Sequence, residues 1–147
     1  MTRALLCTVL LAALVIPEAF GAGSPKLMAH YMPWHQSKPV SGQWGWHWTM
    51  NHYDPELIDE SGRRQIASHQ YPVVGPYDST DLDLLYYHFL LMKVAGIDGV
   101  IIDWYGAADV FDYAGINRAT GLAIEAAERF GLEYAICYED RTLRARV

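Results

Sequence analysis

The sequence has few cysteines and few cationic side chains, and each scarcity excludes a class of protein. Only 2 cysteines occur in 147 residues. Of these, Cys137 alone lies outside the N-terminal apolar segment, which excludes a disulfide-stabilised scaffold and predicts a buried, inert thiol. The 11 Lys and Arg side chains are outnumbered by 17 Asp and Glu, giving a net charge of −6. This acidic balance offers no electrostatic surface for nucleic acid or anionic membranes, so we expect neither partner.

Motifs for nucleotide, metal and acyl-transfer chemistry are also missing. The glycines form no G-x-G-x-x-G or Walker pattern, no histidine pair forms H-E-x-x-H, and no serine lies in G-x-S-x-G. We therefore expect no cofactor and no metal. The alternative is that folding brings His30, His35 and His47 together from separate positions, because metal ligands can be distant in sequence.

The N-terminal segment has the pattern of a secretory signal peptide. Arg3 supplies a positive charge, residues 4–16 form an apolar run, and residues 19–22 (AFGA) offer small side chains for cleavage. The run is shorter than the roughly 20 residues of a membrane-spanning helix. We predict a signal peptide over residues 1–22, a mature domain over residues 23–147, and a secreted or periplasmic location. An uncleaved N-terminal anchor is the alternative.

Strand and helix patterns alternate after this segment. Three short apolar runs predict strands, over residues 26–32, 99–104 and 133–138. The last two lack polar alternation, which predicts burial on both faces. Two segments with helical periodicity separate the strands, over residues 82–94 and about 116–130. This order indicates an α/β fold with a parallel sheet and right-handed crossovers. Two architectures fit: an open doubly wound sheet and a (β/α)8 barrel.

The segment between the first predicted strand and the first predicted helix is long and rich in aromatic residues. Residues 33–76 show no long periodic pattern but contain Trp34, Trp44, Trp46 and Trp48. A loop of this length in a compact domain is either functional or a sign that its elements are wrongly assigned. Flat aromatic faces with one polar handle suit sugar rings, whereas packing of the loop onto the domain is the alternative. We expect a mixture, with one or two Trp buried and the others facing a ligand.

Aromatic and acidic residues follow the ends of the predicted strands. Both architectures bind ligands at the carboxyl ends of parallel strands. Hydrolysis of a glycosidic bond generally uses two carboxyl groups, and Asp103 and Glu139 are candidates. Side chains alternate along a strand, so if Trp104 faces the ligand, Asp103 points elsewhere. We expect Asp103 to form a structural ion pair and Glu139 to contact substrate.

Four motifs resemble a known enzyme family. They are HYMPWH at 30–35, WHW at 46–48, GPYDSTD at 75–81 and LMKVAGIDGVIIDWYG at 91–106. Their order is similar to that in glycoside hydrolase family 99 and its 71/99-like relatives, whose best-known activities are endo-α-mannosidase and endo-α-mannanase. The resemblance covers about residues 27–142. It implies a (β/α)8 barrel and a retaining hydrolase that acts on an α-linked glycan without a cofactor.

The resemblance also implies residue roles. The predicted substrate-binding residues are His30, Tyr31, Trp34, Trp46, Trp48, Trp104, Tyr105 and Glu139. Trp104 is expected to stack on sugar, Glu139 to contact it through the carboxylate, and His30, Tyr31 and Tyr105 to contact hydroxyls. The other three Trp are candidates for the cleft wall.

No catalytic residue is predicted in this sequence. The family's catalytic carboxylates lie in a later strand-end loop, downstream of the matched region. A (β/α)8 barrel takes roughly 200–250 residues or more, so we expect the chain to be the N-terminal portion of a longer hydrolase, with about three strands and two helices. A non-catalytic carbohydrate-binding module with an aromatic platform is the alternative function.

Overall fold

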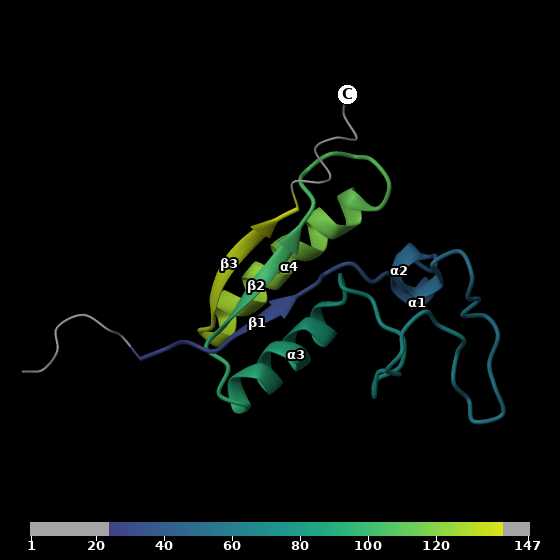
Figure 1. The fold of residues 1–147 in the computed structure, drawn as a ribbon, viewed down its shortest axis with the longest axis horizontal. Coiled ribbons are helices and arrows are strands. Elements are labelled where there is room, and N and C mark those ends of the chain that lie inside the picture. The colour runs from purple at the N-terminus through teal and green to yellow at the C-terminus, as the bar shows by residue number, and fades with distance from the viewer. Residues whose placement is uncertain (1–23, 140–147) are drawn as a thin grey trace, which may run out of the picture.

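The computed structural model describes residues 24–139, which form one parallel sheet with two long helices against it (Figure 1). The strands are β1 (Met28–Tyr31), β2 (Gly99–Trp104) and β3 (Glu133–Tyr138). They lie in the order β1-β2-β3, and both neighbouring pairs are parallel. The helices are α1 (Lys38–Ser41), α2 (Trp46–Thr49), α3 (Leu82–Val94) and α4 (Tyr113–Phe130). The predicted signal peptide lies outside the described residues.

The predicted strands and helices are confirmed, with small differences at their ends. Helix α3 begins after Asp81, whose carboxylate accepts hydrogen bonds from the backbone N–H groups of Asp83 and Leu84. Helix α4 begins at Tyr113 instead of Ile116, because the Ile116 N–H already donates to the Asp112 carbonyl. Within the described part of the chain, no helix has the length and apolar character needed to cross a membrane.

The main core lies between the sheet and the two long helices. Leu85 and Phe89 of α3 are fully buried against Val100 and Ile102 of β2. Helix α4 completes this core with small side chains, among them Ala123, Ala126 and Ala127. Burying a Leu, Val, Ile or Phe side chain contributes about 1.5–3 kcal/mol to the free energy of unfolding. Because side chains of α3 and α4 both pack against Val100 and Ile102, which point to the same side of β2, the two long helices cover the same face of the sheet, as the helices of a barrel do.

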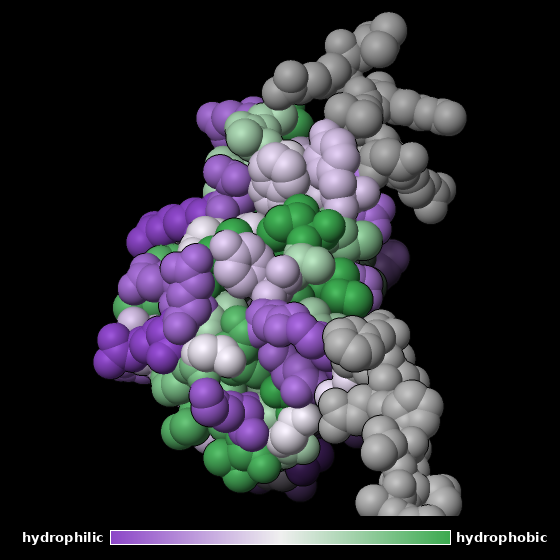
Figure 2. Space-filling model, turned by 90° about the vertical axis from the view of Figure 1, so that its left-hand side faces the viewer, coloured by the Kyte–Doolittle hydropathy of each residue, from purple (hydrophilic) through white to green (hydrophobic). Residues whose placement is uncertain are grey.

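The opposite face of the sheet is open within residues 24–139. His30 of β1 is exposed on this face, and its register partner on β2, Ile101, is 36% exposed. Figure 2 shows hydrophobic residues reaching the surface between hydrophilic ones on one side of the molecule. The burial predicted for β3 is not found in the described residues. Tyr134 and Ile136, in register with Val100 and Ile102 on the helix side, are each more than 40% exposed, because β3 lies at the edge of the sheet there and α4 covers it only in part.

The long segment between β1 and α3 is anchored by the buried side chain of Asp78. Its carboxylate accepts hydrogen bonds from the Ser37 N–H (2.7 Å), the Ser41 hydroxyl (2.6 Å), and the Thr80 N–H (2.9 Å) and hydroxyl (2.7 Å). Burial alone would raise the pKa of Asp78, but these hydrogen bonds outweigh it and hold the pKa below its ordinary value. The ionised carboxylate thus joins residues 37–41, near the start of the segment, to residues 78–80 at its end.

Candidate functional site

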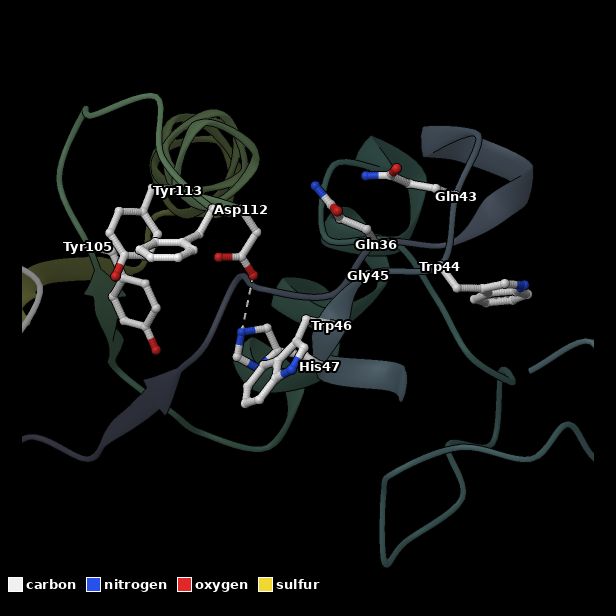
Figure 3. A pocket seen from close by; sticks show the side chains of 10 residues that line it. Gln36, Gln43, Trp44, Gly45, Trp46, His47, Tyr105, Asp112 and Tyr113 are labelled. Atoms are coloured by element: carbon white, nitrogen blue, oxygen red, sulfur yellow. Dashed lines mark ion pairs between the residues drawn. The ribbon is translucent and has the colours of Figure 1, made fainter. Parts of the chain in front are cut away.

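A pocket of about 580 Å³ lies near the carboxyl ends of the strands, where two separate parts of the chain meet (Figure 3). One wall comes from the long segment and α2: Gln36, Gln43, Trp44, Gly45, Trp46 and His47. The other comes from the connection between β2 and α4: Tyr105, Phe111, Asp112 and Tyr113. The pocket therefore lies where the sequence predicted ligand binding, after a strand of the parallel sheet.

An ion pair bridges the two walls of the pocket. The His47 Nε2 lies 3.4 Å from the Asp112 carboxylate, drawn as a dashed line in Figure 3. The His47 side chain is 9% exposed. Trp34 stacks on the imidazole with ring centroids 4.3 Å apart and planes inclined by 7°. The stacking on Trp34 therefore fixes the orientation of the His47 ring. Through its contact with Asp112, His47 in turn connects α2 to the start of α4.

The two glutamines add polar groups to an otherwise aromatic lining. Gln36 reaches α4 because glycines leave room for it. A Cβ at Gly115 would lie 2.3 Å from the Gln36 Nε2, and a Cβ at Gly45 would lie 2.9 Å from the Gln36 Cβ. Each amide side chain offers two N–H donors and one carbonyl acceptor. The pocket thus presents hydrogen-bonding groups of both kinds beside aromatic faces.

The aromatic lining is partly open to solvent. Trp46 is 49% exposed and Phe111 is 85% exposed. Tyr105 packs edge-on against Tyr113, with ring centroids 5.3 Å apart. Burial, together with the nearby carboxylates of Asp103 and Glu139, raises the pKa of Tyr105 to about 12. Tyr105 therefore keeps its phenol proton at neutral pH and can donate a hydrogen bond to a ligand.

Two of the residues predicted to bind substrate are packed into the protein. The Tyr31 hydroxyl lies 3.2 Å from the His88 Nδ1, its ring contacts Phe89 edge-on, and burial raises the pKa of the phenol. Trp48 is 1% exposed, and its indole N–H donates to the Tyr77 carbonyl at 2.8 Å. In this structure neither ring presents a face to the pocket, and Trp48 forms the centre of the packing within the long segment.

Trp104 and His30 lie on opposite faces of the sheet. The Trp104 indole N–H donates to the Asn117 Oδ1 at 2.9 Å, which directs the ring towards α4. His30 is paired in register with Ile101 and is exposed on the face away from the helices, where Asp103 also lies. Asp103 and Trp104 do point to opposite faces, but no ion pair within residues 24–139 includes Asp103, so the predicted ion pair is not found there.

The predicted residues therefore do not form a single site. Trp46 and Tyr105 line the pocket, Trp34 supports it through His47, and Glu139 follows β3, where its backbone N–H donates to the Trp104 carbonyl at 3.0 Å. Of the three histidines considered together, His35 and His47 approach with ring centroids 6.3 Å apart.

Sequence reasoning missed several pocket residues. They are Gln36, Gln43, His47, Phe111, Asp112 and Tyr113. Asp112 lies just before α4 but makes no side-chain capping hydrogen bond, so its position gives only a local signal for the start of the helix. The glutamines and His47 carry no such signal, because only the folded loop brings them to α4.

No family model matches the chain. Three curated relatives do, and all are named glycoprotein endo-alpha-1,2-mannosidase-like protein. The chain is 32% identical to the Mus musculus protein and 30% identical to those of Homo sapiens and Danio rerio, in each case over 95 residues. Each match covers 59% of this chain and 18–19% of the relative. The chain thus spans about a fifth of the length of these relatives.

The solved structures that this chain is similar to are also endo-alpha-mannosidases. The GH99 endo-alpha-mannosidase from Bacteroides thetaiotaomicron, in complex with BIS-TRIS-Propane, matches 81% of this chain with a TM-score of 0.58 and 22% identity. A second structure of that enzyme matches with a TM-score of 0.57 and 20% identity. The matches cover 33% and 36% of those chains. The resemblance to glycoside hydrolase family 99 is therefore confirmed, and the fold is that of part of a (β/α)8 barrel.

Proposed function

We propose that the chain supplies part of the glycan-binding surface of a glycoside hydrolase that acts on α-linked mannan- or glucan-type glycans. The observation that carries this proposal is the pocket between α2 and the β2–α4 connection. It combines exposed aromatic rings, two amide side chains and a carboxylate at the carboxyl end of a parallel strand. A sugar offers apolar C–H faces and a ring of hydroxyl groups, and this lining complements both.

The pocket residues have complementary roles in the proposal. Trp46 and Tyr105 provide ring faces or edges for the sugar, while Gln36 and Gln43 exchange hydrogen bonds with its hydroxyls. Tyr105 is proposed as a donor, since its phenol carries its proton at neutral pH. The sugar class comes from the relatives, which are named for endo-alpha-1,2-mannosidase, and α-mannosides are accordingly the ligands to test first.

Glu139 is the carboxylate that we propose for direct contact with substrate. It follows β3 at the same end of the sheet as Tyr105, and its negative charge contributes to the raised pKa of that phenol. We assign Glu139 a binding role and not bond cleavage, since the family's catalytic carboxylates have no counterpart in the matched motifs. Trp104 is proposed to support this end of the sheet through its hydrogen bond to Asn117.

Titration of the chain with α-1,2-linked manno-oligosaccharides, followed by Trp fluorescence, tests the binding proposal. We expect saturable binding, and we expect Trp46→Ala to weaken it by about 5-fold or more, since a well-packed aromatic contact is worth about 1 kcal/mol. Tyr53→Ala is the matched control, because Tyr53 is 44% exposed and lies outside the pocket lining. Equal affinities for the wild type and Trp46→Ala would contradict the assignment.

The alternative function, a non-catalytic carbohydrate-binding module, predicts the same titration but a different product analysis. Incubation with an α-mannan followed by chromatography of released oligosaccharides tests for cleavage. Release that requires the chain would contradict the module, whereas binding without release is expected both of the module and of a chain that supplies only the binding surface of a hydrolase. A β-linked gluco-oligosaccharide serves as the negative ligand in both assays, and equal binding to it would remove the proposed α-linkage preference.

We also propose that the chain is exported. The support is the charged, apolar and small-residue pattern of residues 1–22. Mass spectrometry of the protein recovered from a secreting host should show a new N-terminus within residues 19–23. An intact N-terminus in an exported protein would favour the uncleaved anchor.

A further inference from the structure

Each strand of the sheet contributes one potential metal ligand to the face that the helices leave open. His30 lies on β1, Asp103 on β2 and Cys137 on β3. Asp103 and Cys137 are paired in register, and His30 is paired with Ile101, two residues before Asp103 and on the same face. The imidazole nitrogen, carboxylate oxygen and thiol sulfur that could bind an ion all lie within 4.8 Å of one another.

The Asp103 carboxylate is a buried anion with incomplete hydrogen bonding. The residue is 4% exposed, and its Oδ1 has no hydrogen-bond partner among the described residues. No lysine, arginine or histidine between residues 24 and 139 forms an ion pair with it. A buried carboxylate oxygen without a partner is costly, and buried carboxylates are usually fully hydrogen-bonded, paired with a cation or bound to a metal. A cation between the three strands would remove this cost.

We propose that His30, Asp103 and Cys137 bind a divalent transition-metal ion of the zinc type, at a site separate from the glycan pocket. The mixed nitrogen, oxygen and sulfur donors favour such an ion over calcium or magnesium, which prefer oxygen ligands. Bonds of about 2.0–2.3 Å place tetrahedral ligands roughly 3.3–3.8 Å apart, so small side-chain rotations close the site. Because His30 is exposed, water completes the coordination.

Binding requires the exchange of one proton for the metal. The Cys137 thiol hydrogen-bonds to Asp103 and carries the proton that is lost. The ion displaces this proton to solvent and forms a metal–sulfur bond, while Asp103 binds through a carboxylate oxygen and His30 through an imidazole nitrogen. The thiolate and carboxylate then balance the two positive charges, and β1, β2 and β3 become joined through one atom.

Titration of the metal-free 147-residue chain with Co²⁺ alone, followed by back-titration with Zn²⁺, tests the site. We expect an intense near-ultraviolet sulfur-to-cobalt absorption, visible bands of a tetrahedral ion, and loss of both when Zn²⁺ is added. Cys137→Ser should abolish the sulfur absorption and weaken Co²⁺ binding at least 10-fold. His52→Ala is the matched control, since His52 is exposed and distant from the cluster in sequence, and should bind as the wild type does.

A second measurement does not depend on the cysteine variant. Zn²⁺ should raise the Tm of the wild type and of His52→Ala but not that of His30→Ala, whose exposed position makes replacement mild for the fold. A missing sulfur absorption in the wild type, or equal Co²⁺ affinities in the wild type and Cys137→Ser, would overturn the proposal. Either result leaves the glycan-binding proposal untouched, because none of the three ligands lines the pocket.

Discussion

The sheet with its two long helices and the long segment before α3 are stabilised in different ways. The helix–sheet core consists of aliphatic and aromatic side chains such as Leu85, Phe89 and Ile102, all fully buried. The long segment has little regular structure, and it is held by stacked rings and by side chains that bond to backbone. Examples are Trp48 stacked on His35 at 3.8 Å and the four hydrogen bonds of Asp78.

The difference explains where the pocket lies. Backbone groups of the sheet and helices are satisfied by each other, so their side chains are free to fill a core. In the long segment, side chains form hydrogen bonds with backbone N–H and carbonyl groups, and aromatic rings pack against one another. The pocket forms at the boundary, where α2 meets the start of α4 through the ion pair of His47 and Asp112. Its shape therefore depends on both regions.

The largest effect is expected from a cavity in the helix–sheet core. Phe89→Ala should lower the free energy of unfolding by about 3–5 kcal/mol, because the side chain is 0% exposed and its removal leaves a void. Urea denaturation monitored by far-ultraviolet circular dichroism measures this. Leu90→Ala, at a neighbouring position that is 49% exposed, is the control and should cost less than about 1 kcal/mol. Equal losses would show that α3 does not pack as described.

The next largest effect should fall on the long segment alone. Asp78→Ala removes the acceptor of four hydrogen bonds, which at about 0.5–1 kcal/mol each amounts to roughly 2–4 kcal/mol. Hydrogen exchange should accelerate in residues 35–80 and remain slow in α4. Asp59→Ala is the control, since Asp59 also accepts several local hydrogen bonds but is exposed. Equal acceleration of hydrogen exchange throughout the chain would show that the long segment does not open independently of the helix–sheet core.

Acid should weaken the long segment through His35. Burial, followed by the nearby His47, lowers the pKa of His35 to about 3 from 6.5. The folded state therefore binds this proton less readily than the unfolded state, so stability is complete above pH 6.5 and falls as the pH drops towards 3. At pH 5 the expected loss is about 2 kcal/mol.

His35→Phe isolates this effect, because it keeps a ring against Trp48 but cannot titrate. Urea denaturation at pH 7.5 and pH 5 should show a smaller loss of stability in the variant than in the wild type. Other titrating groups, including His88, whose pKa burial also lowers, remain in both proteins and cancel in the difference. The same acid-induced loss in both proteins would show that His35 is protonated in the folded state.

The smallest effect is expected at the N-terminus of α3, where the two regions join. Asp81→Ala removes the side-chain acceptor for two backbone N–H groups and should cost about 1 kcal/mol. Asp83→Ala, in the first turn but without a capping hydrogen bond in the described contacts, should cost about half as much or less. Thermal unfolding measures both losses of stability. A larger loss in Asp83→Ala than in Asp81→Ala would contradict the assignment of Asp81 as the N-cap.

The sequence predicts the regular elements well and the site only in part. The apolar runs identify β2 and β3, and the capping aspartate with helical periodicity identifies α3, because these signals are local. The sequence cannot show whether a ring in a non-periodic segment is buried. Trp46 and Trp48 are two residues apart, yet one is 49% and the other 1% exposed. That difference is set by His35 and Tyr77, which only the folded segment brings to Trp48.

The pairing of β1 with β2 has a consequence for the order of folding. Met28 is paired with Gly99 across the whole long segment and α3, whereas β2 and β3 are separated by α4 and two short connections. The entropy lost on closing a loop grows with its length, and distant contacts form more slowly than near ones. We therefore expect the β2–α4–β3 unit to assemble first and to act as the template on which β1 docks, so that the pocket is completed last.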